Sequence, residues 1–381
     1  MDEKGILNPG VYLFSGNDAC AEGAIMAGCK LYAGYPITPS SDMAERMAFR
    51  LPQVGGAYVQ MEDEMASMGV MMGASWAGVK VMTATSGLGF SEMQEHISFA
   101  VATETPCVII DVQRGGPGSG VVALPMQGDV YQARWGHHAS SELIALTPSS
   151  VQECFNCTID AFNLSEQYRV PVILLTDAKL AHLREKMRIP PVDEIKIVNR
   201  RKPTGKPEEC YPFLAQEGVA PMPSFGEGYR FVVTSTSHNE KGDAMMTADT
   251  HYKLVRRINE KILRDRDKLT RIETQYMDDA DVAVVAYGTP ARGALRAVKV
   301  AREAGIKAGY VRLITLWPFN EQHVRKVLEG VRQVVVVELN MGQMEREVCR
   351  AVGPNVPVHL VMDICRLCHP DDIYRKIREV A

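Results

Sequence analysis

The sequence predicts an α/β protein built from two units, each with a parallel sheet. Apolar, β-rich runs alternate with segments of helical period over residues 11–190, and the alternation returns over residues 282–361. Seven prolines between residues 190 and 223 separate the two regions. Strands that alternate with helices form parallel sheets covered on both faces. With 381 residues, the chain has room for two or three domains.

The elements of the first unit follow from these runs. Strands are expected at residues 57–60, 79–83, 107–112, 144–146 and 172–175, and helices at 19–27, 41–50, 64–77, 90–103 and 150–168. The last helix has a clear start signal. Ser149 or Ser150 is a candidate N-cap, and Glu153 would complete a capping box with Ser150.

The proline-rich stretch predicts a connecting arm, because proline at this density prevents long regular elements. A long amphipathic helix is expected over residues 250–275, since Leu254, Ile258 and Ile262 repeat at helical spacing. In the second unit we expect strands at 282–287, 308–313, 334–337 and 358–361, with helices at 291–304 and 321–328. The predicted domains are residues 1–190, an arm at 191–255, and residues 256–381.

Composition excludes several classes of protein. The net charge is −4 and no basic block occurs, which argues against a nucleic-acid surface. No apolar run approaches the ~20 residues that cross a bilayer. The first residues, MDEKGILNPG, lack the apolar core of a signal peptide. Nine cysteines, an odd number in a long chain, favour a reducing cytoplasm over a disulfide framework.

Methionine is concentrated around the helix expected at 64–77. The cluster comprises Met61, Met65, Met68, Met71, Met72 and Met82. An adaptable core around one helix is one interpretation. An interface with a partner subunit is the other.

Two segments of the first unit carry candidate chemistry directly after strands. The first is Gly34-Tyr35-Pro36-Ile37-Thr38-Pro39-Ser40-Ser41, a rigid loop in which Ser40 or Ser41 caps the next helix. Such a loop is either a stiff turn or a site for an anion or carbonyl group. The second segment places Glu62, Asp63 and Glu64 at the start of an apolar helix. The helix dipole favours acids there, but burial of Glu64 would raise its pKa and suit it to sharing a proton with a bound base.

Two glycine-rich segments follow the next strands. One runs from Thr83 to Phe90 and contains Ser86 and Gly87, which permit close backbone approach or form an ordinary turn. The other runs from Asp111 to Gly120 and contains Arg114, suited either to gripping a carboxylate or to a surface salt bridge. Because all four segments follow predicted parallel strands, they share the edge where open α/β sheets bind ligands.

These motifs together resemble the α subunit of 2-oxoacid:ferredoxin oxidoreductases. The segments GYPITPSS, MEDEMAS, MTATSG and VQRGGPGSG occur in that order, and QGDVYQARWG and SSVQEC resemble the 2-oxoglutarate branch. The resemblance covers nearly the whole chain. It implies a pyrimidine-binding thiamine diphosphate domain followed by a domain like the C-terminal domain of transketolase.

The resemblance also implies an activity and a set of residue roles. Such enzymes decarboxylate a 2-oxoacid on thiamine diphosphate, pass electrons through [4Fe–4S] clusters to ferredoxin, and acylate coenzyme A, with the reverse direction also known. Glu64 would face the aminopyrimidine ring, since Gly69 follows at the family spacing; Glu62 is the reserve. Thr38 and Arg114 would contact the substrate. Tyr35, Pro36 and Ile37 would shape the pocket, with Ser86 and Gly87 beside the cofactor.

The chain differs in two ways from a complete site of the family that it resembles. Family members often read Gly-Gly-Pro-Ser-Thr-Gly where Gly118 and Ser119 stand here, so Ser119 is the remaining hydroxyl near the substrate tail. No Gly-Asp-Gly motif for Mg²⁺ and diphosphate occurs in the chain. A β subunit should therefore supply the Mg²⁺ site and [4Fe–4S] clusters, with γ- and δ-type subunits also expected; no metal ligand is assigned to this chain.

Several features remain open on sequence alone. The pairs Cys154–Cys157 and Cys365–Cys368 are each C-x-x-C, but no further cysteine stands nearby to complete a cluster site. His137 and His138 could neighbour the active site or form a surface pair. The segment from Glu338 to Gln343 resembles interface or cofactor-neighbour structure. A branched-chain 2-oxoacid as substrate, or a non-catalytic scaffold, are the alternative functions.

Overall fold

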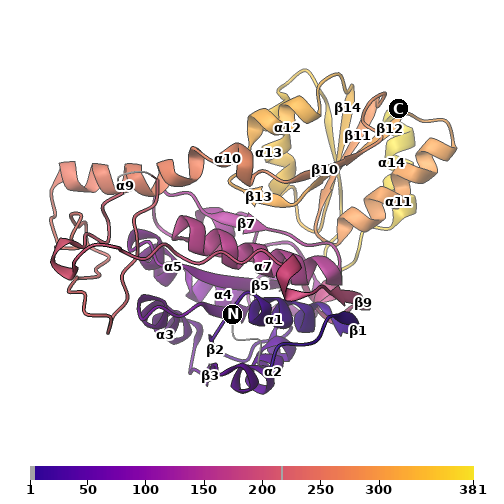
Figure 1. Ribbon diagram of the computed structural model, residues 1–381. Helices are drawn as coiled ribbons and strands as arrows, with labels where there is room; N and C mark the ends of the chain where they lie inside the picture. Colours follow the sequence, from indigo (N-terminus) through magenta and orange to yellow (C-terminus); the bar gives the residue numbers. More distant parts are fainter. Residues whose placement is uncertain (1–4, 216–217) are drawn as a thin grey trace.

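The computed structural model describes residues 5–215 and 218–381 as two α/β lobes and a long connecting segment (Figure 1). The first lobe holds the larger sheet, whose strand order is β13-β7-β8-β5-β4-β2-β3, with β6 paired to β5. Its parallel strands are β2 (Leu31–Gly34), β3 (Ala57–Gln60), β4 (Val81–Thr85), β5 (Cys107–Gly115), β7 (Ile144–Leu146) and β8 (Pro171–Asp177). The antiparallel ones are β6 (Val121–Pro125) and β13 (Thr315–Trp317).

Every residue of strand β5 is buried, which marks it as the centre of this lobe. Helices of the lobe pack in pairs: α1 (Gly16–Met26) lies on α7 (Val151–Tyr168), and α3 (Glu64–Trp76) lies on α5 (Gln94–Ala102). Shorter helices are α2 (Ser41–Arg50), α4 (Leu88–Glu92), α6 (Gln132–Trp135) and α8 (Ala178–His182). The helix expected at 90–103 is thus split into α4 and α5.

A two-stranded antiparallel sheet lies outside the expected elements. It pairs β1 (Gly10–Ser15) with β9 (Arg184–Ile189). Val11 and Leu13 on β1 are largely exposed. The sequence analysis assigned no strand to either segment, because a ribbon of two edge strands gives neither a long apolar run nor a helix period.

The arm is anchored on the first lobe by buried polar and aromatic contacts. Arg200 forms a buried salt bridge with Glu166 on α7, and its Nη1 also donates to the Ser75 carbonyl at 2.6 Å. Phe213 is fully buried against Trp76. Over the described residues 191–215 and 218–247, the helical structure is limited to short 3₁₀ turns at Val192–Glu194 and Pro207–Glu209, as the prolines predict.

The helix expected over residues 250–275 is too long. The structure has α9 (Ala248–Leu263) and the short α10 (Arg266–Leu269), and then strand β10 (Ile272–Gln275). Charged residues dominate the whole stretch, so the amphipathic pattern did not reveal where the helix stops. Strand β10 instead pairs with β12 at the edge of the second sheet.

The second lobe contains a five-stranded sheet of order β10-β12-β11-β14-β15. Strands β11 (Val282–Tyr287), β12 (Ala308–Leu313), β14 (Gln333–Glu338) and β15 (Val358–Met362) are parallel, as predicted. The helices are α11 (Pro290–Glu303), α12 (Glu321–Val327), α13 (Gln343–Val352) and α14 (Pro370–Val380). No helix in the described ranges is long and apolar enough to cross a membrane.

The two lobes share hydrogen bonds and even a sheet. Strand β13 belongs to the second lobe in sequence but pairs with β7 of the first, and Trp317 Nε1 donates to the Val130 carbonyl at 2.8 Å. Glu153 links the lobes by binding Arg312. The predicted capping box is therefore half right: Ser150 caps α7, but the Glu153 carboxylate accepts from the N–H of Ser149.

Alanine at Gly23 should destabilise the fold. Helices α1 and α7 approach closely there, and a Cβ at Gly23 would lie 2.6 Å from the Phe155 carbonyl oxygen. Overpacking of this kind costs about 1–3 kcal/mol, so urea denaturation should show a lower free energy of unfolding for Gly23→Ala. Gly73→Ala is the matched control, because a Cβ there meets no atom within 4 Å. Equal stability of the two variants would contradict the close approach.

Candidate active site

The four segments singled out in the sequence meet at one edge of the larger sheet. They follow β2, β3, β4 and β5, which are neighbours in the order β5-β4-β2-β3 and run parallel. The carboxyl ends of these strands therefore lie side by side. The four segments thus share one edge of the sheet, as predicted, and in open α/β sheets this is the edge where ligands usually bind.

Glu64 is buried at the first position of α3, although the helix begins beside exposed Glu62. Asp63 is the N-cap and accepts a hydrogen bond from the Ala66 N–H at 2.7 Å. Thr85 Oγ1, at the end of β4, donates to Glu64 Oε1 at 3.2 Å. Burial, and after it the charge of Glu92, raise the pKa of Glu64. A buried carboxyl with a raised pKa can hold a proton and share it with a base.

Gly89 makes room for this carboxyl. A Cβ at Gly89 would lie 2.0 Å from Glu64 Oε1 and 2.4 Å from Thr85 Oγ1. No side chain fits at that position without moving Glu64. Thr85 and Gly89 were inside the segment that the sequence analysis selected, but their contacts with Glu64 depend on the pairing of β4 beside β2.

The loop after β2 presents Thr38 at the same edge. Tyr35, Pro36 and Thr38 are exposed, whereas Ile37 is buried. Ser40 occupies the N-cap position of α2, but its hydroxyl donates back to the Ile37 carbonyl at 2.8 Å. The predicted serine cap is therefore wrong in its bonding: the hydroxyl stiffens the loop and accepts nothing from the helix.

Arg114 crosses from β5 to the Thr38 loop. Its Nη1 donates to the Thr38 carbonyl at 2.5 Å, and its Nε is buried without a hydrogen-bond partner in the part of the chain that the structure describes. The side chain is almost fully buried. A surface salt bridge, the alternative interpretation, is therefore excluded. The guanidinium group keeps donors for a further acceptor such as a carboxylate.

Ser86 and Gly87 lie between Arg114 and the core. Gly87 has φ +48°, a conformation that favours glycine, and a Cβ there would approach Arg114 Cγ to 4.0 Å. The Ser86 hydroxyl is buried and has no hydrogen-bond partner among the described residues. Ser119 lies on the exposed loop after Arg114. The structure thus brings Ser86 and Gly87 close to Arg114 but leaves Ser119 facing solvent.

The sequence analysis missed two further groups at this edge. Asp129 comes from the loop after β6 and faces the buried Asp111. Cys365, from the second lobe, lies against the end of β5, since a Cβ on Gly115 would be 2.6 Å from its Sγ. Neither contact has a local signal in the sequence. Both depend on how distant segments pack.

The residues at this edge fit the pyrimidine end of thiamine diphosphate. Glu64 supplies a buried carboxyl, Ser86 a free buried hydroxyl, and Gly87 and Gly89 leave space that a side chain would fill. Within residues 5–215 and 218–381, no group of three His, Cys, Asp or Glu side chains could hold a metal ion.

The open features of the sequence have mostly structural roles. His137 is buried with Nε2 2.6 Å from the Ser141 hydroxyl, and burial lowers its pKa to about 4. His138 is exposed. Cys154 and Cys157 are buried in α7. In the methionine cluster, Met68, Met71, Met72 and Met82 are core, whereas Met65 is 44% exposed.

The segment from Glu338 to Gln343 joins the lobes. Asn340 Nδ2 donates to the Gln127 carbonyl at 2.8 Å, and Gln127 Oε1 accepts from the Leu339 N–H at 2.9 Å. Gln343 Nε2 donates to the Gly128 carbonyl at 2.7 Å. The interface expected there lies between the two lobes of one chain.

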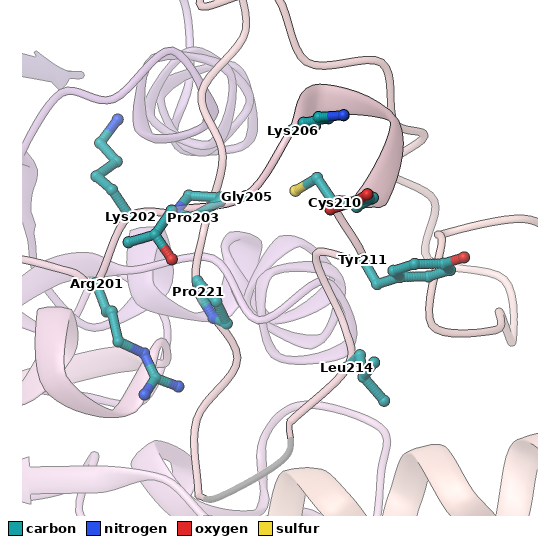
Figure 2. Close-up of a pocket in the computed structure, with 11 residues that line it drawn as sticks. Arg201, Lys202, Pro203, Gly205, Lys206, Cys210, Tyr211, Leu214 and Pro221 are labelled. Carbon is teal, nitrogen blue, oxygen red and sulfur yellow. The ribbon is translucent and has the colours of Figure 1, made fainter.

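A separate cavity of about 540 Å³ lies within the arm (Figure 2). Arg201, Lys202, Lys206, Cys210 and Tyr211 are among the residues that line it. Lys202 is paired with Glu227, and Arg201 donates to the Val219 carbonyl. None of the residues at the sheet edge lines this cavity, so it is distinct from the candidate active site.

Fold and site together define a thiamine diphosphate-binding oxidoreductase. Residues 22–257 match the family described as pyruvate flavodoxin/ferredoxin oxidoreductase, thiamine diphosphate-binding, and residues 280–372 match the pyruvate:ferredoxin oxidoreductase core domain II. The chain belongs to this family, which confirms the resemblance seen in its motifs.

Particular relatives are similar over nearly the whole chain. 2-Oxoglutarate synthase subunit KorA of Methanothermobacter marburgensis is 51% identical, over 96% of this chain and 98% of the relative. Ketoisovalerate oxidoreductase subunit VorB of Methanothermobacter thermautotrophicus is 37% identical, over 97% of each chain. The solved 2-oxoglutarate:ferredoxin oxidoreductase from Magnetococcus marinus, with 2-oxoglutarate, coenzyme A and succinyl-CoA bound, matches with TM-score 0.91 and 31% identity. That match covers 97% of this chain and 65% of the solved one.

Burial of the Glu64 carboxyl should cost stability above its pKa. A carboxyl whose pKa rises on folding stabilises the fold below its unfolded value, and this contribution is lost as pH rises through the folded value. Glu64→Gln keeps the shape and an acceptor for Thr85 but cannot ionise. Its free energy of unfolding should therefore exceed that of the wild type at about pH 8, and the difference should shrink at about pH 5.

Urea denaturation of the chain at both pH values measures this difference. Glu62→Gln is the control, because Glu62 is exposed, and it should leave the stability unchanged. A Glu64→Gln chain that is less stable than wild type at about pH 8 would contradict the burial cost.

Proposed function

We propose that this chain is the α subunit of a heteromeric enzyme that converts 2-oxoglutarate, coenzyme A and oxidised ferredoxin to succinyl-CoA, CO₂ and reduced ferredoxin, in either direction. The observation that carries the proposal is the convergence of buried Glu64 and nearly buried Arg114 at one sheet edge. The 51% identical relative is named 2-oxoglutarate synthase, and the ketoisovalerate relative is 37% identical. This difference favours 2-oxoglutarate over a branched-chain substrate.

In this proposal, thiamine diphosphate would supply the chemistry of 2-oxoacid decarboxylation when bound, and Glu64 would hold its aminopyrimidine end and carry a proton to and from it. Glu64 is buried, and Thr85 and Gly89 fix its position. Its raised pKa lets it hold a proton against a ring nitrogen and return it. A non-catalytic scaffold would gain nothing from this buried carboxyl, which opposes that alternative.

Arg114 would bind the carboxylate of the 2-oxoacid. Its buried guanidinium has a donor without a partner among the described residues, and it already holds the Thr38 loop in place. A charge-assisted pair in a water-poor site is stronger than one at the surface. Thr38 would contact the substrate directly, with Tyr35, Pro36 and Ile37 forming the wall. Ser119 would face the substrate tail once a partner covers its loop.

A β subunit would complete the site with Mg²⁺ and [4Fe–4S] clusters, and γ- and δ-type subunits would join the complex. Exposed apolar residues beside the site support this: Val121, Val122 and Leu124 on β6 are each more than 40% exposed. On α3, Met65, Gly69 and Gly73 are also exposed. A cytoplasmic complex is consistent with nine cysteines that are all unpaired.

The complex purified with its partner chains should reduce a viologen dye in a coenzyme A-dependent reaction. We expect a higher kcat/KM with 2-oxoglutarate than with pyruvate or 2-oxoisovalerate. Arg114→Ala should raise the KM for the 2-oxoacid or abolish turnover, because a buried charge pair contributes about 2–5 kcal/mol. The control Arg184→Ala removes an exposed arginine on β9. Normal kinetics for Arg114→Ala would remove Arg114 from substrate binding.

A bulky residue at Gly69 should block assembly without unfolding the chain. A Cβ at Gly69 meets no atom within 4 Å, so Gly69→Arg fits the isolated chain. If α3 packs on the partner, this variant should fail to co-elute with the partner chains in size-exclusion chromatography. Gln322→Arg on exposed α12 is the control. Normal assembly of Gly69→Arg would place the partner on another face.

A further inference from the structure

Two carboxyl groups face each other directly beneath the candidate active site. Asp111 lies on β5, three residues before Arg114, and is fully buried. Neither of its carboxylate oxygens has a well-formed hydrogen bond from any described residue. Asp129 reaches it from the loop after β6, to within hydrogen-bonding range, and Asp129 Oδ2 is also buried without a donor. Two buried carboxyl groups that face each other favour a proton shared between them.

The surroundings tie this pair to the substrate side. Gly87 N–H points to Asp111, while Arg114 Cγ lies 4.0 Å from the Cβ position on the same Gly87. Asp129 N–H donates to Gln113 Oε1 at 3.1 Å, next to Arg114 in β5. The pair therefore borders the loop and the strand that hold the guanidinium group.

The charged groups that act on the pair come from few elements. On β5 the charged group is Arg114, and on the loop after β6 it is Asp129, which is a member of the pair. On β4, Thr85 is the neighbour of Asp111 in register, and on β8, Thr176 Oγ1 donates to the Asp111 carbonyl at 3.5 Å. Strand β8 ends in a further buried carboxyl, Asp177, which is in register with Gln113. From α13, Glu347 is bound by the Tyr131 hydroxyl at 3.2 Å.

Burial makes one proton of the pair titrate near neutrality. Burial, followed by the charge of Asp129, raises the pKa of Asp111 well above its usual value. Burial also raises the pKa of Asp129 to about 6, although the Asp111 hydrogen bond and the Arg114 charge oppose that rise. Burial thus favours the protonated form of Asp111, while the pKa of Asp129, at about 6, lies near the physiological range.

We propose that Asp111 and Asp129 form a proton-sharing pair that positions Arg114 and takes up a proton when a 2-oxoacid carboxylate binds to it. The inference rests on the proposed function of Arg114. An ionised Asp129 competes with the substrate carboxylate for the field of one guanidinium group. When the substrate binds, a protonated Asp129 removes that competition, so binding and proton uptake are linked. Asp129 is a positioning residue and does not touch the substrate.

The linkage fixes the sign of the pH effect. Above about pH 6, the free site has lost the Asp129 proton, which must be regained on binding. The KM for the 2-oxoacid should therefore rise with pH, by about threefold to tenfold between about pH 6 and pH 8. One linked proton allows the KM to rise by at most about tenfold per pH unit. Asp129→Asn imitates the protonated form, so its KM should vary by less than about twofold over that range.

The test measures kcat and KM for 2-oxoglutarate against pH in the assembled complex, by coenzyme A-dependent viologen reduction. Asp129→Glu should restore the pH dependence, since it restores a titratable carboxyl. Asp278→Asn, at an exposed aspartate, controls for the loss of one charge and should behave as wild type. A purely structural Asp129 would instead lower kcat or stability without flattening the KM profile.

The outcomes separate this inference from the proposed function. A wild-type complex that turns over 2-oxoglutarate, with Arg114→Ala impaired and Asp129→Asn keeping the wild-type pH slope, overturns the inference alone. A flat wild-type KM profile does the same. A complex that is inactive on every 2-oxoacid overturns the proposed function. A flat profile in Asp129→Asn, with the slope kept in Asp129→Glu, supports the inference.

Discussion

The polar end of the buried strand β5 is the constraint on which the site depends. All nine residues of β5 are buried, yet its last five carry Asp111, Gln113 and Arg114. Buried polar groups cost several kcal/mol unless they are paired. Gln113 and Arg114 are therefore paired with segments that are distant in sequence. Gln113 donates to the Thr176 carbonyl at 3.1 Å and binds Asp129, while Arg114 holds the Thr38 loop. The hydrogen bonds of Gln113 and Arg114 on β5 thus hold the loops around the candidate site in place.

Buried polar side chains of the second lobe also form hydrogen bonds, and some of these connect it to the first lobe. The Tyr287 hydroxyl donates to Glu338 Oε2 at 2.7 Å, and the Asn340 amide donates both to that hydroxyl and to the Gln127 carbonyl at 2.8 Å. Burial raises the pKa of Glu338, so this network keeps a buried carboxyl that is bonded on several sides. Fully satisfied buried networks specify one arrangement of their parts. The loop of residues 127–131, which carries Asp129, is therefore held by both lobes.

The candidate site combines buried functional groups with an exposed rim. Glu64 and Arg114 are buried deeply enough for acid–base and carboxylate chemistry, whereas Thr38, Ser119 and the β6 side chains remain exposed. Catalysis gains most from preorganised charges in sites that exclude water. An edge with buried functional groups and an exposed apolar rim fits a site that a second subunit closes.

The sequence by itself determined the periodic elements and the shared sheet edge. Strand runs at 57–60, 144–146, 282–287 and 308–313 match the structure, because buried parallel strands read as short apolar runs between helices. Local motifs also selected Thr38 and Glu64, in the loops after β2 and β3, and Arg114, near the end of β5; their roles stay predictions. Only the tertiary structure decided the β1–β9 ribbon, the crossing of β13 into the first sheet and the pairing of Asp129 with Asp111. These features depend on contacts between residues that are far apart in the chain. The energy of such contacts comes from burying polar groups and giving them hydrogen-bond partners at the same time, and no local sequence pattern indicates it.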